Sequence, residues 1–206
     1  MSAIHPIERE SYRILRDRID LSHLAPGPRA VVERVIHATA DLEYAATMVA
    51  PTAAVDAAVA ALASGRPVVA DVEMTRSGIT GVAAACYLRA AEAAPGLTRS
   101  AAAIRLAADH HPEGAVVVIG CAPTALSEAL ALARDGRWQP AVLIALPVGF
   151  VGASAAKQAA LASGLAVISN TGEKGGAAAA AAVCNALVRL ASNGDHYRDR
   201  GGAPHD

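Results

Sequence analysis

Short apolar runs alternate with longer alanine-rich segments from residue 66 onward. The short runs predict strands at 67–72, 83–88, 115–120, 141–146 and 165–169. Several are apolar at every position, which is typical of strands covered on both faces. The longer segments predict helices at 98–110, 123–135, 154–163 and 175–191. This alternation predicts right-handed βαβ units and an α/β fold with an open, mostly parallel, Rossmann-like sheet.

The segments that follow three of these strands are rich in Gly and Pro, at 120–123, 147–150 and 171–176. In open α/β sheets, ligands bind outside the carboxyl ends of the strands. We therefore expect these three turns to line the ligand crevice.

Residues 1–65 have a different pattern, with many arginines and no segment typical of a strand. Their periodicity predicts helices at 7–18, 28–40 and 52–64. We expect this part to form a helical segment over the crevice, next to an α/β core at 66–192. The polar, Gly-rich residues 193–206 are expected to form a flexible tail of the same single domain.

Composition excludes several classes of protein. The 206 residues carry 18 basic and 19 acidic side chains, and this near-neutral balance argues against a nucleic-acid partner. No uninterrupted apolar stretch is long enough for a membrane span, and the first residues lack the apolar core of a signal peptide. The three cysteines, Cys86, Cys121 and Cys184, are widely spaced. We expect a soluble cytoplasmic protein without disulfides.

His37 is the most informative polar residue of the predicted helix at 28–40. At about 100° per residue it lies opposite an apolar arc, and two interpretations remain open: a solvated surface histidine, or a cleft-facing acid. Glu33 and Asp41, one turn away on either side, would raise its pKa. The apolar arc comprises Val31, Val32, Val35, Ile36 and Thr39.

Other polar positions could meet an anion. Arg99 stands at the start of a helix that Thr98 can cap, and Lys174 lies in a Gly-rich turn. Neither GxxxxGK[ST] nor GxGxxG is present, so a nucleotide loop is not supported. The histidines show no zinc-ligand spacing, and no G-x-S-x-G elbow occurs. No cofactor or metal is predicted.

Several strings of residues, in order from His5 to about Leu190, resemble the precorrin-8X methylmutase family. They include RVIHATAD, GCAPTAL, PVGFVGA and TGEKGG. The resemblance implies an α/β homodimer without an organic cofactor. It also implies an isomerase of cobalamin biosynthesis, which moves a methyl group from carbon 11 to carbon 12 of a corrin precursor to give hydrogenobyrinate.

The resemblance assigns the catalytic histidine to His37 and active-site positions to Ser11, Thr80 and Arg99. We add Lys174 as a predicted substrate contact. An imidazolium that protonates a ring nitrogen would favour the rearrangement, and such general-acid assistance is typically worth about 10²–10⁴-fold. The substrate is a corrinoid fringed with carboxylates, so cations at the rim of a broad cleft are expected.

The chain departs from the residues usual in the family at three positions. They are Cys121, Glu173 and Ala177, where Asn, Arg and Ser are common in the family. An acidic Glu173 beside a polycarboxylate would weaken binding unless it points away. A rival hypothesis is therefore a non-catalytic corrinoid-binding or carrier protein of the same fold. The intact RVIHATAD string favours the enzyme.

Overall fold

The described part of the chain, residues 5–192 of a computed structural model, is organised around one six-stranded sheet. The strand order is β1-β6-β5-β4-β2-β3, and every neighbouring pair is parallel except β1 with β6. This confirms the predicted open, mostly parallel sheet. The strands are β1 Met48–Val49, β2 Val68–Ala70, β3 Ala84–Ala85, β4 Val116–Ile119, β5 Val142–Ala145 and β6 Val167–Asn170.

The central strands are apolar throughout because both faces of the sheet are covered. Alternate side chains of β4 enter two separate cores: Val116 and Val118 pack on one face, and Val117 and Ile119 on the other. Strands β5 and β6 divide in the same way. Burial on both sides thus explains why these strands read as continuous apolar runs.

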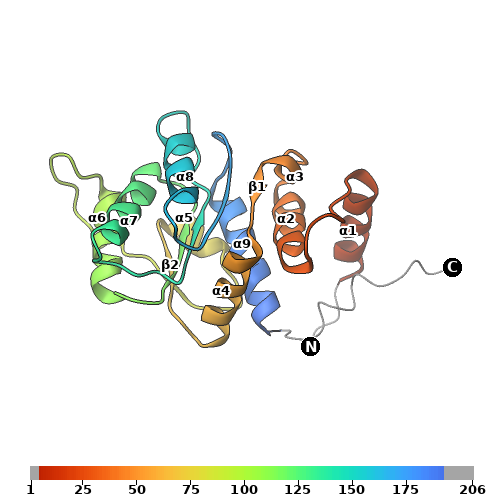
Figure 1. The fold of residues 1–206 in the computed structure, drawn as a ribbon, viewed down its shortest axis with the longest axis horizontal. Coiled ribbons are helices and arrows are strands. Elements are labelled where there is room, and N and C mark those ends of the chain that lie inside the picture. Colours follow the sequence, from red (N-terminus) through yellow and green to blue (C-terminus); the bar gives the residue numbers. More distant parts are fainter. Residues whose placement is uncertain (1–4, 193–206) are drawn as a thin grey trace.

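The helices form layers on the two faces (Figure 1). Helices α6, α7 and α8 cover one face, and α4, α5 and α9 cover the other. Helix α2 packs on α9, and α1 packs outermost on α2. The helices are α1 Pro6–Arg18, α2 Pro26–Thr39, α3 Tyr44–Thr47, α4 Thr52–Ala63, α5 Glu73–Gly78, α6 Arg99–His110, α7 Pro123–Arg134, α8 Ala153–Leu161 and α9 Ala177–Ser192.

The structure corrects the prediction in four short elements. Residues 1–65 do contain a strand, β1, which lies antiparallel on the edge of β6 and is extended by the bond from Thr171 N to Thr47 O. Helices α3 and α5 were also absent from the prediction, and the strand expected at 83–88 is reduced to β3. These elements have two to six residues each, too few for a periodicity to show. The predicted tail at 193–206 lies outside the described residues.

A buried carboxylate fills the point of the sheet where ligands usually bind. Strand β2 lies between β3 and β4. The chain passes from β2 to β3 on one side and then crosses to β4 on the other, so the turns after β2 and β4 meet at a switch point. There Asp71 is fully buried, and its Oδ2 accepts the N–H groups of Cys121 and Ala122 at 2.8 and 3.0 Å. Thr75 donates to its other oxygen at 2.8 Å. These amides, just before α7, are therefore satisfied from within.

In the part of the chain that the structure describes, no helix combines the length and the apolar character that a membrane crossing requires.

Candidate functional site

His37 lies in the last turn of α2, on the side that faces α1. Its Nδ1 atom is 2.8 Å from the hydroxyl oxygen of Ser11. The Tyr12 ring stacks on the imidazole, with centroids 4.8 Å apart and an interplanar angle of 11°. The predicted apolar arc is confirmed, because Val31, Val32, Val35 and Ile36 are all buried. His37 is half-buried between two helices and is not a freely solvated histidine.

One face of α1 supplies the residues around this imidazole. Glu8, Ser11 and Tyr12 stand at positions i, i+3 and i+4, so they lie on the same side of the helix. The helix begins favourably for this placement: Pro6 occupies its first turn, and the His5 side chain accepts from the N–H of Ile7 at 3.2 Å. The spacing of E-x-x-S-Y on a predicted helix was the signal that could have revealed the roles of Glu8 and Tyr12.

A cavity of about 770 Å³ lies between α1, α2 and the second half of α9. Tyr12 and Thr80 form part of its wall, and so do Glu8 and Arg34, whose charges act on His37. His37 and Ser11 are not themselves lining residues; they lie beside the cavity, next to Tyr12. The cavity therefore adjoins the imidazole and contains one further predicted position, Thr80.

The cavity wall carries more positive than negative side chains. Arg16 forms a two-pronged contact with the buried carboxylate of Glu33, at 2.8 Å for both bonds. Arg9 has no side-chain ion pair with any residue between 5 and 192. An anionic ligand would find a net positive wall here. The lining charges are five arginines, Arg9, Arg13, Arg16, Arg34 and Arg189, against three acids, Glu8, Asp17 and Glu33.

The expected electrostatics of His37 were wrong. We expected Glu33 and Asp41 to raise its pKa, but Glu33 is bound to Arg16 and Asp41 to Lys174. Burial lowers the pKa of His37 below 6.5, the charge of Arg34 lowers it further, and Glu8 acts in the opposite direction. Burial, together with the charge of Arg34 one turn away on the same helix, therefore decides the direction of this shift.

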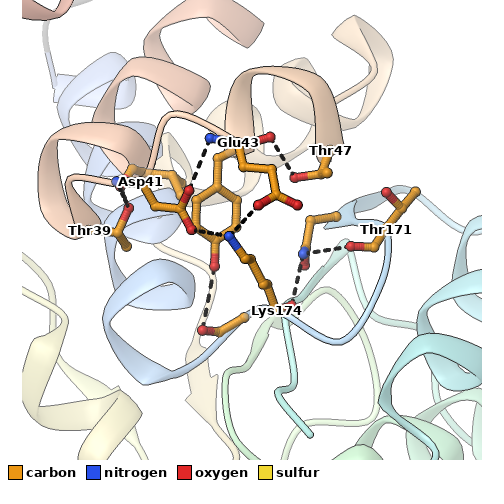
Figure 2. Close-up of polar contacts among 10 residues, drawn as sticks. Thr39, Asp41, Glu43, Thr47, Thr171 and Lys174 are labelled. Carbon is orange, nitrogen blue, oxygen red and sulfur yellow. Dashed lines mark hydrogen bonds and ion pairs between the residues drawn. The ribbon is translucent and has the colours of Figure 1, made fainter. Parts of the chain in front are cut away.

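Lys174, in the loop after β6, binds the segment that follows α2 (Figure 2). Its Nζ atom lies 2.7 Å from Oδ2 of Asp41 and 2.5 Å from Oε2 of Glu43. These carboxylates raise the pKa of Lys174. Tyr44 adds a longer contact from its hydroxyl to the carbonyl of Gly175, at 3.5 Å. Lys174 thus joins the end of the His37 helix to the carboxyl edge of the sheet.

The loop that carries Lys174 packs closely against the end of β5. A Cβ atom on Gly175 would clash with the carbonyl oxygens of Leu146 and Pro147, so this position requires glycine. The fully buried Lys157 of α8 also holds this loop: it donates to the carbonyl of Lys174 at 2.6 Å and to Oδ1 of Asn170 at 3.2 Å. Burial lowers the pKa of Lys157 to about 8, although the charge of Glu173 opposes this. Lys157 had no role in the sequence-based prediction.

The structure brings only some of the predicted site residues together. Ser11 touches His37, and Thr80 lines the adjoining cavity. Arg99 is exposed at the start of α6, on the opposite face of the sheet from α2, and does not line the cavity. Lys174 lies outside the cavity as well.

The cavity lies apart from the three turns that were expected to line the ligand crevice. None of the turns at 120–123, 147–150 and 171–176 lines it, and the amino-terminal helices around it pack along α9. At the carboxyl edge of the sheet, Asp71 accepts the amide groups of Cys121 and Ala122.

Among residues 5–192 no three His, Cys, Asp or Glu side chains are grouped so as to hold a metal ion. The arrangement offers a positioned imidazole, one hydroxyl partner and an arginine-rich cavity, which suit acid–base chemistry on an anionic ligand.

Comparisons with known proteins agree along nearly the whole chain. The model of the CbiC family, precorrin-8X methylmutase, matches residues 6–190. The cobalt-precorrin-8 methylmutase of Methanothermobacter thermautotrophicus is 38% identical over 196 residues, covering 92% of this chain and 94% of that protein. The precorrin-8X methylmutase of a Sinorhizobium species is 37% identical over 196 residues, covering 89% and 93%.

A solved structure shows the same fold. The crystal structure of the precorrin-8X methyl mutase from Thermus thermophilus matches with a TM-score of 0.84 at 34% identity, covering 92% of this chain and 99% of that one. Fold and sequence together define an α/β isomerase that acts as a methylmutase. The chain belongs to the precorrin-8X methylmutase family of cobalamin biosynthesis.

Proposed function

We propose that this protein converts precorrin-8X or its cobalt-containing counterpart by moving the methyl group on carbon 11 to carbon 12, with His37 as the general acid. The observation that carries the proposal is the geometry of His37: Ser11 binds its Nδ1 at 2.8 Å, Tyr12 stacks on its ring, and an arginine-rich cavity adjoins it. The two relatives of similar identity carry both substrate names. The proposal is therefore stated for the methyl shift that the two substrates share.

In the proposed step, protonated His37 donates from Nε2 to a ring nitrogen of the macrocycle. When the ring is protonated, Nδ1–H donates to the Ser11 hydroxyl, which fixes the imidazole and leaves Nε2 for the substrate. Protonation withdraws electron density and assists migration of the methyl group within the same molecule. The proton then returns to Nε2, so the reaction is an isomerisation with no net change in atoms.

The cavity is proposed to hold the macrocycle with its carboxylates against the arginines. A volume of about 770 Å³ lies within the range of small-molecule sites. Guanidinium groups bind carboxylates in a two-pronged geometry. Thr80 lines this cavity and is proposed as a substrate contact. Arg99 and Lys174 remain substrate contacts predicted by the sequence, outside the cavity of a single chain.

The resemblance also implies a homodimer, and we include it in the proposal. Two apolar side chains in the loop between β5 and α8 support it: Phe150 is 95% exposed and Val151 is 89% exposed. Adjacent exposed apolar residues of this size are typical of a surface that meets another protein.

The decisive experiment is conversion of the macrocycle by purified protein. Mixed with precorrin-8X, the wild type should give the absorption spectrum of hydrogenobyrinate, while His37→Gln should bind the macrocycle without converting it. Arg99→Gln tests the predicted contact and should raise KM with little change in kcat. If the wild type binds the macrocycle but never converts it, the carrier hypothesis replaces the enzyme.

A further inference from the structure

Glu8 forms ion pairs with both arginines whose charges act on His37. Its Oε1 atom lies 3.0 Å from Nη1 of Arg189 on α9 and 3.5 Å from Nη1 of Arg34 on α2. One carboxylate of α1 is thus shared by two guanidinium groups from the two helices behind it. Since Glu8 also lies one turn before Ser11 and Tyr12, this ion-pair cluster and the imidazole contacts share one face of α1.

The charged groups that act on His37 come from all three packed helices. Arg34 stands one turn before it on α2, Arg189 approaches from α9, and Glu8 from α1. Beyond the end of α2, Asp41 and Glu43 are held by Lys174. Two cations and a single carboxylate therefore determine the local field at the imidazole.

Glu8 is ionised under ordinary conditions. Burial raises its pKa, but the hydrogen bond and charge of Arg189 and the charge of Arg34 outweigh this, so the pKa of Glu8 lies below its usual value. Its negative charge is thus present across the neutral range, where it offsets the cations beside His37.

We propose that Glu8 is a positioning residue for His37: it fixes Arg34 and Arg189 beside the imidazole and offsets their charge, so that His37 retains its proton closer to neutral pH. Without Glu8, two guanidinium groups would face the imidazolium with no carboxylate between them, and repulsion between like charges would favour the neutral ring. The consequence for turnover rests on the proposed function, because only a general acid must be protonated to act.

The test is a titration of His37 by NMR in the full chain with labelled histidine rings, His37→Gln serving to assign the signal. In Glu8→Gln the midpoint should fall by about half a pH unit or more. Glu10→Gln is the matched control. The carboxylate of Glu10 lies on the same helix but pairs with Arg13, so its removal should leave the midpoint of His37 unchanged. The inference is overturned if Glu8→Gln titrates like the wild type, or if Glu10→Gln shifts the midpoint equally.

Two further variants keep the inference testable if Glu8→Gln does not fold. Arg34→Gln and Arg189→Gln each leave Glu8 in place with one cation fewer, so each should raise the midpoint. Failure of both to raise it overturns the inference. Restoration of the midpoint toward the wild-type value in the double variant Glu8→Gln/Arg34→Gln would support direct electrostatic coupling.

The activity of the same variants separates this inference from the proposed function. A fall of half a unit in the midpoint should lower kcat/KM at pH 7 about threefold, because the protonated fraction falls by that factor. If the NMR midpoint shifts in Glu8→Gln while the pH profile of turnover does not, the role of Glu8 stands and the general-acid role of His37 fails.

Discussion

The ammonium group of Lys174 lies 2.7 Å from the carboxylate of Asp41, which directly follows the helix that carries His37. The same ammonium contacts Glu43, so a single side chain joins the loop after β6 to the connection between α2 and α3 (Figure 2). Ala40 ends α2 in the left-handed region, with φ of 54°. A strained residue at this helix end is held in place by its surroundings, and Lys174 provides part of them.

Lys174→Met should loosen the segment from 40 to 47, because two carboxylates lose their cation while Lys174→Arg can keep them bound. Hydrogen exchange should show faster exchange of the amides of Ala46 and Thr47 in the Met variant and wild-type rates in the Arg variant. If exchange is unchanged in Lys174→Met while KM for the corrinoid rises, Lys174 is the substrate contact that the sequence predicted and not a support for α2.

Ser11→Ala should lower kcat about tenfold, since loss of a hydrogen bond of about 1–1.5 kcal/mol would leave the Nδ1 side of His37 without its partner. Steady-state kinetics check this, and Ser11→Thr, which keeps a hydroxyl, is the matched control. A Ser11→Ala enzyme with wild-type kcat would show that the hydroxyl does not orient the imidazole during the reaction.

The pH dependence of turnover follows from the environment of His37. Burial and the charge of Arg34 place its pKa below 6.5. A general acid acts in its protonated form, so kcat/KM should decline about tenfold per pH unit above a midpoint that lies below 6.5. Initial rates between pH 5 and 8 measure this. A midpoint above 6.5 would agree instead with the carboxylate-flanked histidine that the sequence suggested.

Much of the fold could be predicted because the sequence pattern records burial directly. Strand β4 is apolar at all four positions since both faces of the sheet are covered. The helical arc that buries Val35 and Ile36 also placed His37 on the other side of α2. Strand β1 could not be predicted from the sequence pattern, because its two residues form a strand only through pairing with the edge of β6.

The electrostatics of the site could not be predicted in the same way. Glu33 and Asp41 are near His37 along the helix, but their partners, Arg16 and Lys174, come from other elements. The lowered pKa of His37 results first from burial and then from the charge of Arg34, and the helical spacing of the two carboxylates does not reveal that burial.

Lys157 should give stability a distinct dependence on alkaline pH. Its pKa is about 8 in the folded protein, against 10.5 for an ordinary lysine, so between these values the unfolded chain binds more protons than the folded chain. The free energy of unfolding therefore gains a positive slope of up to about 1.4 kcal/mol per pH unit in this interval. Urea unfolding at several pH values should show this slope in the wild type and not in Lys157→Met. Equal slopes would mean that the folded and unfolded lysines titrate alike.

The exposed loop between β5 and α8 provides the test of the proposed homodimer. Phe150→Glu places a charge on a side chain that is 95% exposed in the single chain, so its effect on folding should be small. If this loop meets a second copy, the buried charge should dissociate the dimer, and sedimentation equilibrium would report a monomer. Ile7→Glu is the matched control, because Ile7 is also apolar and 73% exposed but lies on α1. Dissociation by Ile7→Glu alone would place the interface at α1, and a wild type that sediments as a monomer would remove the dimer from the proposal.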